Sequence, residues 1–125
     1  MTGPLPPKRI LIIEDEILIQ KSLKKILEKR GAQVDAVSNG KEAIQMITQH
    51  NYDKIICDLM LQDITGFDVL EESKKKYSIS EISQLFIIIT AYISKQVLDK
   101  AANYGCKIIS KPFDDLKIVI EEFLK

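Results

Sequence analysis

The chain has 125 residues, 46% of them hydrophobic, and its 18 basic and 18 acidic side chains cancel to a formal net charge of zero. This composition is typical of one globular domain with a buried core, and it excludes a largely disordered chain. A balanced charge gives no support for nucleic-acid binding, and no apolar run is long enough for a transmembrane helix. We therefore expect neither nucleic acid nor a membrane as a partner of this chain.

The N-terminal residues 1–7 contain three prolines and a glycine but no apolar core segment. They resemble a disordered leader more than a signal peptide, so we expect a single domain over residues 8–125. The two cysteines, Cys57 and Cys106, lie in or beside apolar runs, which is typical of buried reduced thiols. These features together predict a cytoplasmic protein.

Apolar runs alternate with helical patterns five times along the chain. The predicted strands are 10–13, 34–37, 54–58, 85–89 and 106–109. Residues 78–83 are polar and are expected to form a connection. The helical patterns place apolar side chains on one face of each helix, at Ile19, Leu23, Ile26 and Leu27; Ala43, Ile44 and Ile47; Phe67 and Leu70; Val97, Leu98, Ala101 and Ala102; and Leu116, Val119, Ile120, Phe123 and Leu124.

Alternation with short crossovers predicts parallel strand pairing, with helices on both faces of the sheet. The carboxyl ends of such strands share one edge, where open α/β folds place their ligands. The residues at these ends are Glu14, Asp15, Asp58, Thr90 and Lys111. Each has an ordinary interpretation by itself, as a turn residue, a helix-dipole partner, a strand residue or a surface charge. Their coincidence at one edge favours a functional site.

Carboxylates crowded at one edge repel each other unless a cation neutralises them. Oxygen ligands with room for water suit Mg²⁺, whereas zinc prefers sulfur and imidazole ligands. A metal, a lysine and a hydroxyl can together stabilise the charge of a phosphoryl group in transfer. Asp58 is the best candidate for the attacking carboxylate, because its strand lies between the others.

The acidic pair Glu14-Asp15, the lone Asp58, Thr90 and the sequence Lys111-Pro112-Phe113 resemble the receiver domain of two-component response regulators. The resemblance covers essentially residues 8–125. It implies a flavodoxin-like, doubly wound sheet of five parallel strands in the order 2-1-3-4-5. Sequence alone leaves open whether the chain is a single-domain regulator or part of a longer regulator or hybrid kinase.

The resemblance also implies a role for each residue. Asp58 would accept the phosphoryl group, and Thr90 and Lys111 would each contact a phosphoryl oxygen. Mg²⁺ would be bound by Asp15 and Asp58, by Glu14 mainly through water, and by the backbone carbonyl of Met60. The Lys111–Pro112 peptide bond would be cis.

Two positions depart from the family pattern. Ile108 stands where many receivers carry a tyrosine or phenylalanine that moves with the threonine, so Thr90, Ile108 and Pro112 are the expected but altered readout residues. Gln62 stands where the loop after the acceptor often has a proline. Both changes concern how the signal is read, because neither removes a residue of the phosphorylation chemistry.

We therefore expect a phosphorylation-activated switch that receives its phosphoryl group from a sensor histidine kinase or a histidine phosphotransfer protein. Its output protein is unknown, and a phosphorylation-dependent homodimer is compatible with it. It would not be a turnover enzyme, although slow Mg²⁺-dependent loss of its own phosphate is compatible with the site. No organic cofactor is expected.

Three alternatives differ in what they require. A constitutive interaction module with the same fold would not depend on phosphate. A flavin or nucleotide binder would need a phosphate loop rich in glycine, serine or threonine after the first strand, where this chain has Glu14-Asp15-Glu16. A haloacid-dehalogenase-like phosphatase would carry its nucleophilic aspartate at that position with a second aspartate two residues on, and the pair Glu14–Glu16 does not fit this pattern.

Overall fold

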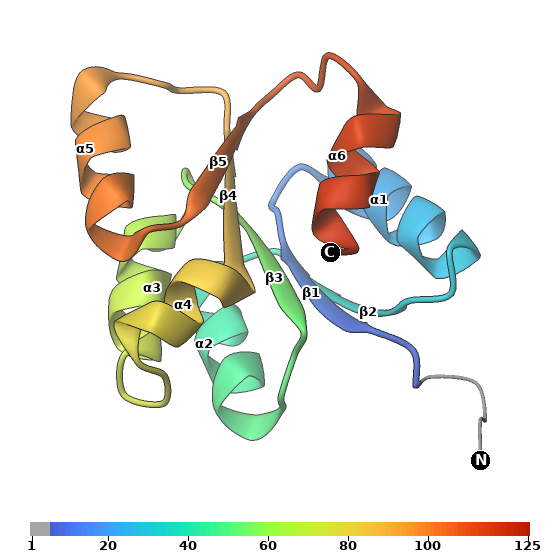
Figure 1. Cartoon of the computed structure of the whole chain (residues 1–125), viewed down its shortest axis with the longest axis horizontal. Helices are drawn as coiled ribbons and strands as arrows, with labels where there is room; N and C mark the ends of the chain where they lie inside the picture. Colours follow the sequence, from blue (N-terminus) through green and yellow to red (C-terminus); the bar gives the residue numbers. More distant parts are fainter. Residues whose placement is uncertain (1–5) are drawn as a thin grey trace.

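The computed structural model describes residues 6–125 and shows a parallel sheet between two layers of helices (Figure 1). The strands are β1 (Arg9–Ile13), β2 (Gln33–Val37), β3 (Lys54–Asp58), β4 (Phe86–Thr90) and β5 (Lys107–Ser110). Their order is β2-β1-β3-β4-β5, and all four neighbouring pairs are parallel. The predicted α/β fold with strand order 2-1-3-4-5 is therefore confirmed.

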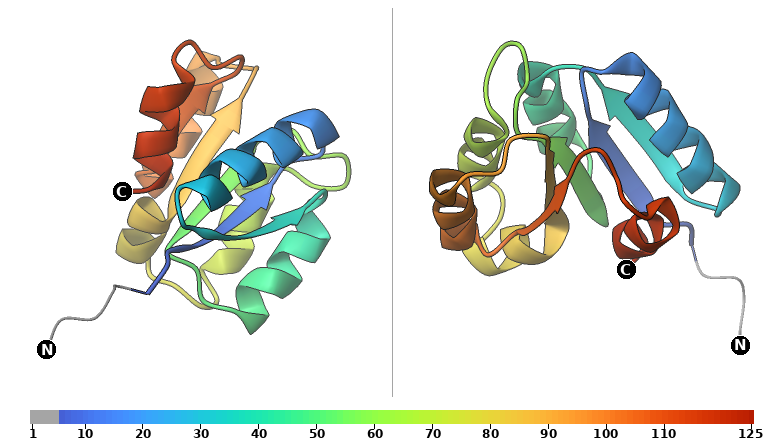
Figure 2. Two further views of the ribbon diagram at one scale, coloured as in Figure 1. Left: turned by 90° about the vertical axis from the view of Figure 1, so that its right-hand side faces the viewer. Right: turned by 90° about the horizontal axis from the view of Figure 1, so that it is seen from above.

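The helices are α1 (Ile17–Lys29), α2 (Gly40–Gln49), α3 (Gly66–Ser73), α4 (Ile79–Leu85), α5 (Lys95–Tyr104) and α6 (Leu116–Phe123). One face of the sheet packs against α2, α3, α4 and α5, and the other packs against α1 and α6. Figure 2 shows the two layers from the side and from above. Strand residues such as Ile12, Ile56 and Ile88 are fully buried between them, as expected for a doubly wound sheet.

The expected polar connection over residues 78–83 is wrong, because this segment belongs to α4. Ser78 and Glu81 form a capping box at its start, in which each side chain bonds the backbone N–H of the other. Ile82 and Leu85 pack into the core, so Leu85 ends this helix and does not begin the fourth strand. The capping box and the burial of Ile82 and Leu85 together are enough to form this short helix.

The predicted apolar face of α5 is also partly wrong. Ala101 is buried and Val97 is half-buried, but Leu98 is 48% exposed and Ala102 is exposed. Tyr104, at the end of the helix, contributes the large buried side chain instead and stacks on Phe67 of α3 with ring centroids 6.2 Å apart. This helix is therefore held at its C-terminal end.

Residues 1–5 of the predicted leader lie outside the described residues. Pro6 and Pro7 are exposed and belong to no helix or strand. In the described part of the chain, no helix is both long enough and apolar enough to cross a membrane.

Candidate functional site

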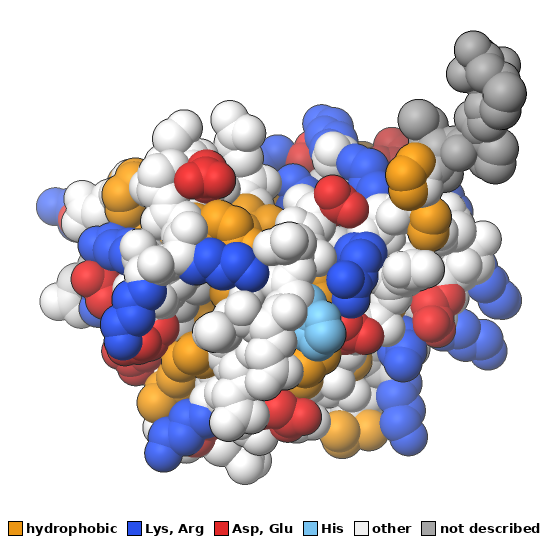
Figure 3. All heavy atoms as spheres, turned by 90° about the horizontal axis from the view of Figure 1, so that it is seen from below, with side chains coloured by type: hydrophobic (Ala, Val, Ile, Leu, Met, Phe, Trp, Pro, Cys, Tyr) orange, Lys and Arg blue, Asp and Glu red, His pale blue; other side chains and the backbone are white. Residues whose placement is uncertain are grey.

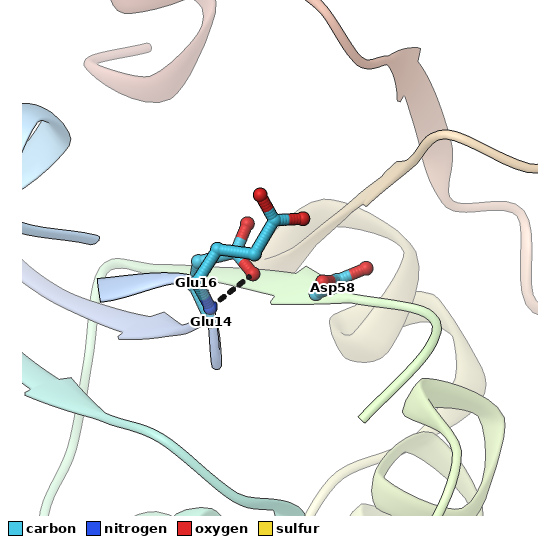
Figure 4. A group of neighbouring side chains, drawn as sticks. All are labelled: Glu14, Glu16 and Asp58. Carbon is cyan, nitrogen blue, oxygen red and sulfur yellow. Dashed lines mark hydrogen bonds between the residues drawn. The ribbon is translucent and has the colours of Figure 1, made fainter. Parts of the chain in front are cut away.

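Glu14 follows β1 directly and its side chain is fully buried. Its backbone N–H donates to Val37 O of β2 at 3.1 Å, which holds the end of β1 beside the end of β2. One oxygen of its carboxylate, Oε2, accepts a hydrogen bond from the Glu16 backbone N–H at 3.2 Å, as drawn in Figure 4. The other oxygen faces the middle of the site, where it meets Lys111.

Asp58 is the last residue of β3 and is 3% exposed. Its Oδ1 accepts a hydrogen bond from the Met60 N–H at 3.2 Å, so the first turn of the following loop is tied to the carboxylate. The backbone N–H of Leu59 donates to Ile89 O of β4 at 3.0 Å. These bonds hold Asp58 against β4 and against the start of the following loop.

Lys111 lies just beyond β5 and joins the acidic side chains of the site. Its Nζ donates to Glu14 Oε1 at 2.9 Å and to Asp58 Oδ2 at 3.0 Å. A third contact, to Glu16 Oε1, measures 3.3 Å, and the Lys111 side chain is only 7% exposed. One ammonium thus bridges carboxylates that are 97 and 53 residues away in sequence.

The charges of this cluster are incompletely balanced. Burial and, next, the neighbouring Asp58 carboxylate raise the pKa of Glu14 to about 7, although the Lys111 hydrogen bond opposes this shift. For Lys111 burial by itself would lower the pKa, but its bonds to Glu14 and Asp58 raise the pKa well above the usual lysine range. The ammonium therefore stays charged while one carboxylate is driven toward its neutral form.

The donor set fits a divalent cation with a preference for oxygen. Oxygens of Glu14, Glu16 and Asp58 lie within 4.8 Å of one another. Crowded carboxylates gain from a second cation, and carboxylates are the ligands that Mg²⁺ takes in proteins. Asp15, the predicted direct ligand, is half-buried and does not belong to this group.

Thr90 ends β4 beside the cluster and is fully buried. Its Oγ1 accepts a hydrogen bond from the Tyr92 N–H at 3.0 Å, and its carbonyl accepts one from the Lys111 N–H at 2.8 Å. The backbone of Lys111 is thus fastened to β4 while its side chain reaches across to β1 and β3.

The remaining predicted residues line the edges of the site. Met60 is 50% exposed, and it pairs with Thr65 in an isolated bridge across the loop after β3. Ile108 is half-buried and packs against the core on the α5 side of the sheet. The peptide bond between Lys111 and Pro112 is cis, as the resemblance implied.

Sequence reasoning missed three residues near the site. Glu16 was not predicted to approach Lys111. Gly66 lies against the acceptor strand, because a Cβ at this position would lie 2.8 Å from Asp58 O and 3.0 Å from Leu59 Cα. Gln20 is buried on α1 against the end of β1. Its signal was available, because a glutamine on the apolar side of an amphipathic helix needs buried partners.

The sequence matches the family model "Response regulator receiver domain" over residues 10–121. The chain therefore belongs to the response regulator receiver domain family, whose members serve two-component systems. It is 30% identical over 107 residues to the "Probable transcriptional regulator ycf29" of Pyropia yezoensis, and the match covers 85% of the chain but 47% of that protein. The chain thus spans about half the length of this curated relative.

Two further relatives have nearly the same extent as the chain. The "Polar-differentiation response regulator DivK" of Brucella anthropi is 30% identical over 107 residues, with 85% of each chain covered. A CheY-like response regulator receiver domain protein of Methanospirillum hungatei JF-1 has a crystal structure that superposes with a TM-score of 0.81. That match is 30% identical in sequence and covers 94% of both chains.

Proposed function

We propose that this receiver domain accepts a phosphoryl group on Asp58 and thereby changes a protein-binding surface. The observation that carries the proposal is the bridge from Lys111 Nζ to both Glu14 and Asp58 at the carboxyl edge of the sheet. This bridge places a buried cation against the candidate nucleophile, where an incoming phosphoryl oxygen needs a positive partner.

The transfer would form a bond between an Asp58 carboxylate oxygen and phosphorus, while the bond from phosphorus to the donor breaks and the donor leaves. Lys111 would exchange its Asp58 contact for a phosphoryl oxygen. Thr90 would donate its hydroxyl to another phosphoryl oxygen after giving up the bond it donates to Tyr92 O. The new contacts of Lys111 and Thr90 would give the charged phosphoryl group one cationic and one polar partner.

Mg²⁺ is the proposed cofactor and would neutralise charge on the phosphoryl oxygens and the carboxylates. Glu14 and Asp58 are the buried carboxylates that fit it, and Glu16 is an exposed third. Asp15 and the Met60 carbonyl complete the set that the family resemblance implies. Because the bound group leaves Asp58 only by hydrolysis or onward transfer, we propose a switch and not an enzyme that turns over outside substrates.

An apolar groove beside the site supports a histidine-containing partner as the donor. The groove has a volume of about 270 Å³ and lies between α1 and the segment from Lys111 to Leu116. Leu18 on its rim is 82% exposed, and Leu116 is 40% exposed. An exposed apolar groove next to the reacting carboxylate suits docking of a helix from a sensor histidine kinase or a histidine phosphotransfer protein.

The output surface is proposed on α5, β5 and the loop that precedes α5. Tyr92 and Ile93 of this loop and Leu98 of α5 are exposed. An unknown output protein or a second phosphorylated copy of the chain would cover them. On the face seen from below in Figure 3, basic and acidic side chains are interspersed, which gives no support for a polyanionic partner there. The two cysteines are free, Cys57 fully buried and Cys106 half-buried, and this supports our proposal of a cytoplasmic location.

The test is the intact mass of the protein after incubation with Mg²⁺ and either acetyl phosphate or phosphoramidate. We expect one phosphoryl adduct on the wild-type chain, none without Mg²⁺ and none on Asp58→Asn. An equal adduct on Asp58→Asn would refute the assignment of the acceptor. A wild-type chain that binds Mg²⁺ but stays unmodified by every donor would favour the alternative, a constitutive interaction module.

A further inference from the structure

Gln20 is a buried amide on α1 whose side-chain nitrogen is surrounded by oxygen atoms. Its Nε2 donates to Glu14 O at 2.9 Å and to Val37 O at 3.1 Å, and Ser38 Oγ lies 3.3 Å away. Three oxygens around one atom identify that atom as the donor end of the amide. The residue therefore ties α1 to the carboxyl ends of both β1 and β2.

The carbonyl of Glu14 is where β1 leaves the sheet. The ladder pairs Ile13 with Val37 on one side and with Cys57 on the other, and it ends there. The next residue, Glu14, still donates its N–H to Val37 O. In the described part of the chain, the hydrogen bond that the Glu14 carbonyl accepts comes from Gln20. The side chain thus takes over the role of a strand partner at this point.

This carbonyl belongs to the peptide unit that joins Glu14 to Asp15. A planar peptide held at its oxygen has a fixed orientation, and that orientation sets the directions in which the two acidic side chains leave the backbone. The Glu14 side chain is the one that meets Lys111 at 2.9 Å. Without the amide, a buried carbonyl would lose its partner, and the peptide would gain by rotating toward another donor.

We infer that Gln20 is a positioning residue for the acidic cluster. It holds the Glu14–Asp15 peptide so that the Glu14 carboxylate meets Lys111 beside Asp58. The inference rests on the proposed function insofar as the cluster is to bind Mg²⁺. Groups that orient metal ligands from outside contribute about 10- to 100-fold in metal affinity. Among the described residues Gln20 has no hydrogen bond to a carboxylate of the cluster or to Lys111, so its effect would pass through the backbone at the ends of β1 and β2.

The experiment compares the full chain with two variants, using Mg²⁺ alone as the probe. Gln20→Met keeps a side chain of similar length but removes the donor. Leu27→Ala is the matched control, because Leu27 is fully buried on the same helix and has no bond to the cluster. Backbone amide NMR of Asp15 and Met60 follows the titration, and thermal unfolding reports stability.

We expect Gln20→Met to raise the Mg²⁺ dissociation constant about tenfold. We expect Leu27→Ala to leave that constant unchanged while lowering the unfolding temperature at least as much. Equal constants for Gln20→Met and the wild type would overturn the inference. So would a comparable rise in Leu27→Ala, because the effect would then follow stability alone.

A metal-free readout separates this inference from the proposed function. The carbonyl ¹³C shift of Glu14 and the ¹⁵N shift of the Lys111 ammonium are measured without Mg²⁺. Movement of both in Gln20→Met, and of neither in Leu27→Ala, supports the positioning role even if the wild type binds no Mg²⁺ and the proposed function fails. Unchanged shifts in Gln20→Met refute the positioning role, whatever the metal does.

Discussion

The hydroxyl of Tyr104 donates a hydrogen bond to Glu71 Oε2 at 2.6 Å, which fastens the end of α5 to α3. The Tyr104 ring stacks on Phe67 with ring centroids 6.2 Å apart, and Lys74 Nζ lies over the Tyr104 ring, 5.2 Å from its centroid. Burial, followed by the Glu71 bond, raises the pKa of Tyr104 to about 12. Phe67 follows Gly66, so this contact joins α5 to the helix that begins just after the acceptor loop.

Removing only the hydroxyl should loosen α5. We expect Tyr104→Phe to keep the stacking on Phe67 but to lower the free energy of unfolding by about 1 kcal/mol, the usual contribution of one such hydrogen bond. Amide hydrogen exchange over α5 should become faster than in the wild type. Tyr92→Phe is the control, since Tyr92 is 66% exposed. Equal exchange over α5 in the two variants would contradict a specific role for the Glu71 bond.

Replacing Lys111 should destabilise the protein chiefly in the absence of a divalent cation. Lys111→Met leaves Glu14 and Asp58 buried without their ammonium, and breaking one side of a buried ion pair costs about 3–5 kcal/mol. Protonation of Glu14 and added Mg²⁺ should each recover part of this loss. Thermal unfolding with and without Mg²⁺ measures it, with Lys125→Met as the control because that side chain is 68% exposed. A loss that Mg²⁺ does not reduce would speak against metal binding by the same carboxylates.

The pH dependence follows from Glu14, whose pKa is raised from 4.5 to about 7 in the metal-free fold. A carboxyl with a raised pKa holds its proton more tightly when folded, so its contribution to stability is greatest below about pH 4.5 and declines up to about pH 7. Mg²⁺ competes with this proton, so its affinity should weaken as the pH falls from about 8 to about 6. Calorimetric titration at several pH values measures the trend, and Glu14→Gln should flatten it. A Mg²⁺ affinity that rises on acidification would show that another group controls binding.

A methyl group at Gly66 should disturb the acceptor strand. The added Cβ would meet backbone atoms of Asp58 and Leu59, which cannot move aside as a flexible side chain would. We expect Gly66→Ala to cost about 1–3 kcal/mol, as overpacking does, and to weaken Mg²⁺ binding. Gly31→Ala is the control. Alanine is disfavoured at Gly31 by the backbone φ of 90°, but nothing lies within 4 Å of its Cβ position. If the two variants bind Mg²⁺ equally well, the close approach at Gly66 does not position Asp58.

The sequence was sufficient to predict the sheet and the residues at its carboxyl edge, because the pattern there favours one structure. Uninterrupted runs such as Ile10 to Ile13 are typical of strands inside a sheet covered on both faces, and the strand ends then bring Glu14, Asp58 and Lys111 to one edge. The sequence could not show that Glu14 and Glu16 would form the cluster with Asp58, because this choice depends on hydrogen bonds made elsewhere, such as the one from Gln20 to the Glu14 carbonyl. The helix α4 was missed because its polar residues resemble those of a loop until the Ser78–Glu81 cap is recognised.

Lys111 borders both the acidic cluster and the apolar groove. The ammonium of Lys111 belongs to the acidic cluster, while Lys111 and Pro112 line the apolar groove against α1. A movement of Lys111 caused by a ligand in the groove or in the acidic cluster therefore changes the shape of both. A ligand of the groove that shifts this lysine must alter the affinity of the cluster for its own ligand, and by reciprocity the cluster alters the groove by the same factor. The binding of a donor in the groove and the occupancy of the acceptor site would then be energetically coupled through a single residue, without any movement of the sheet.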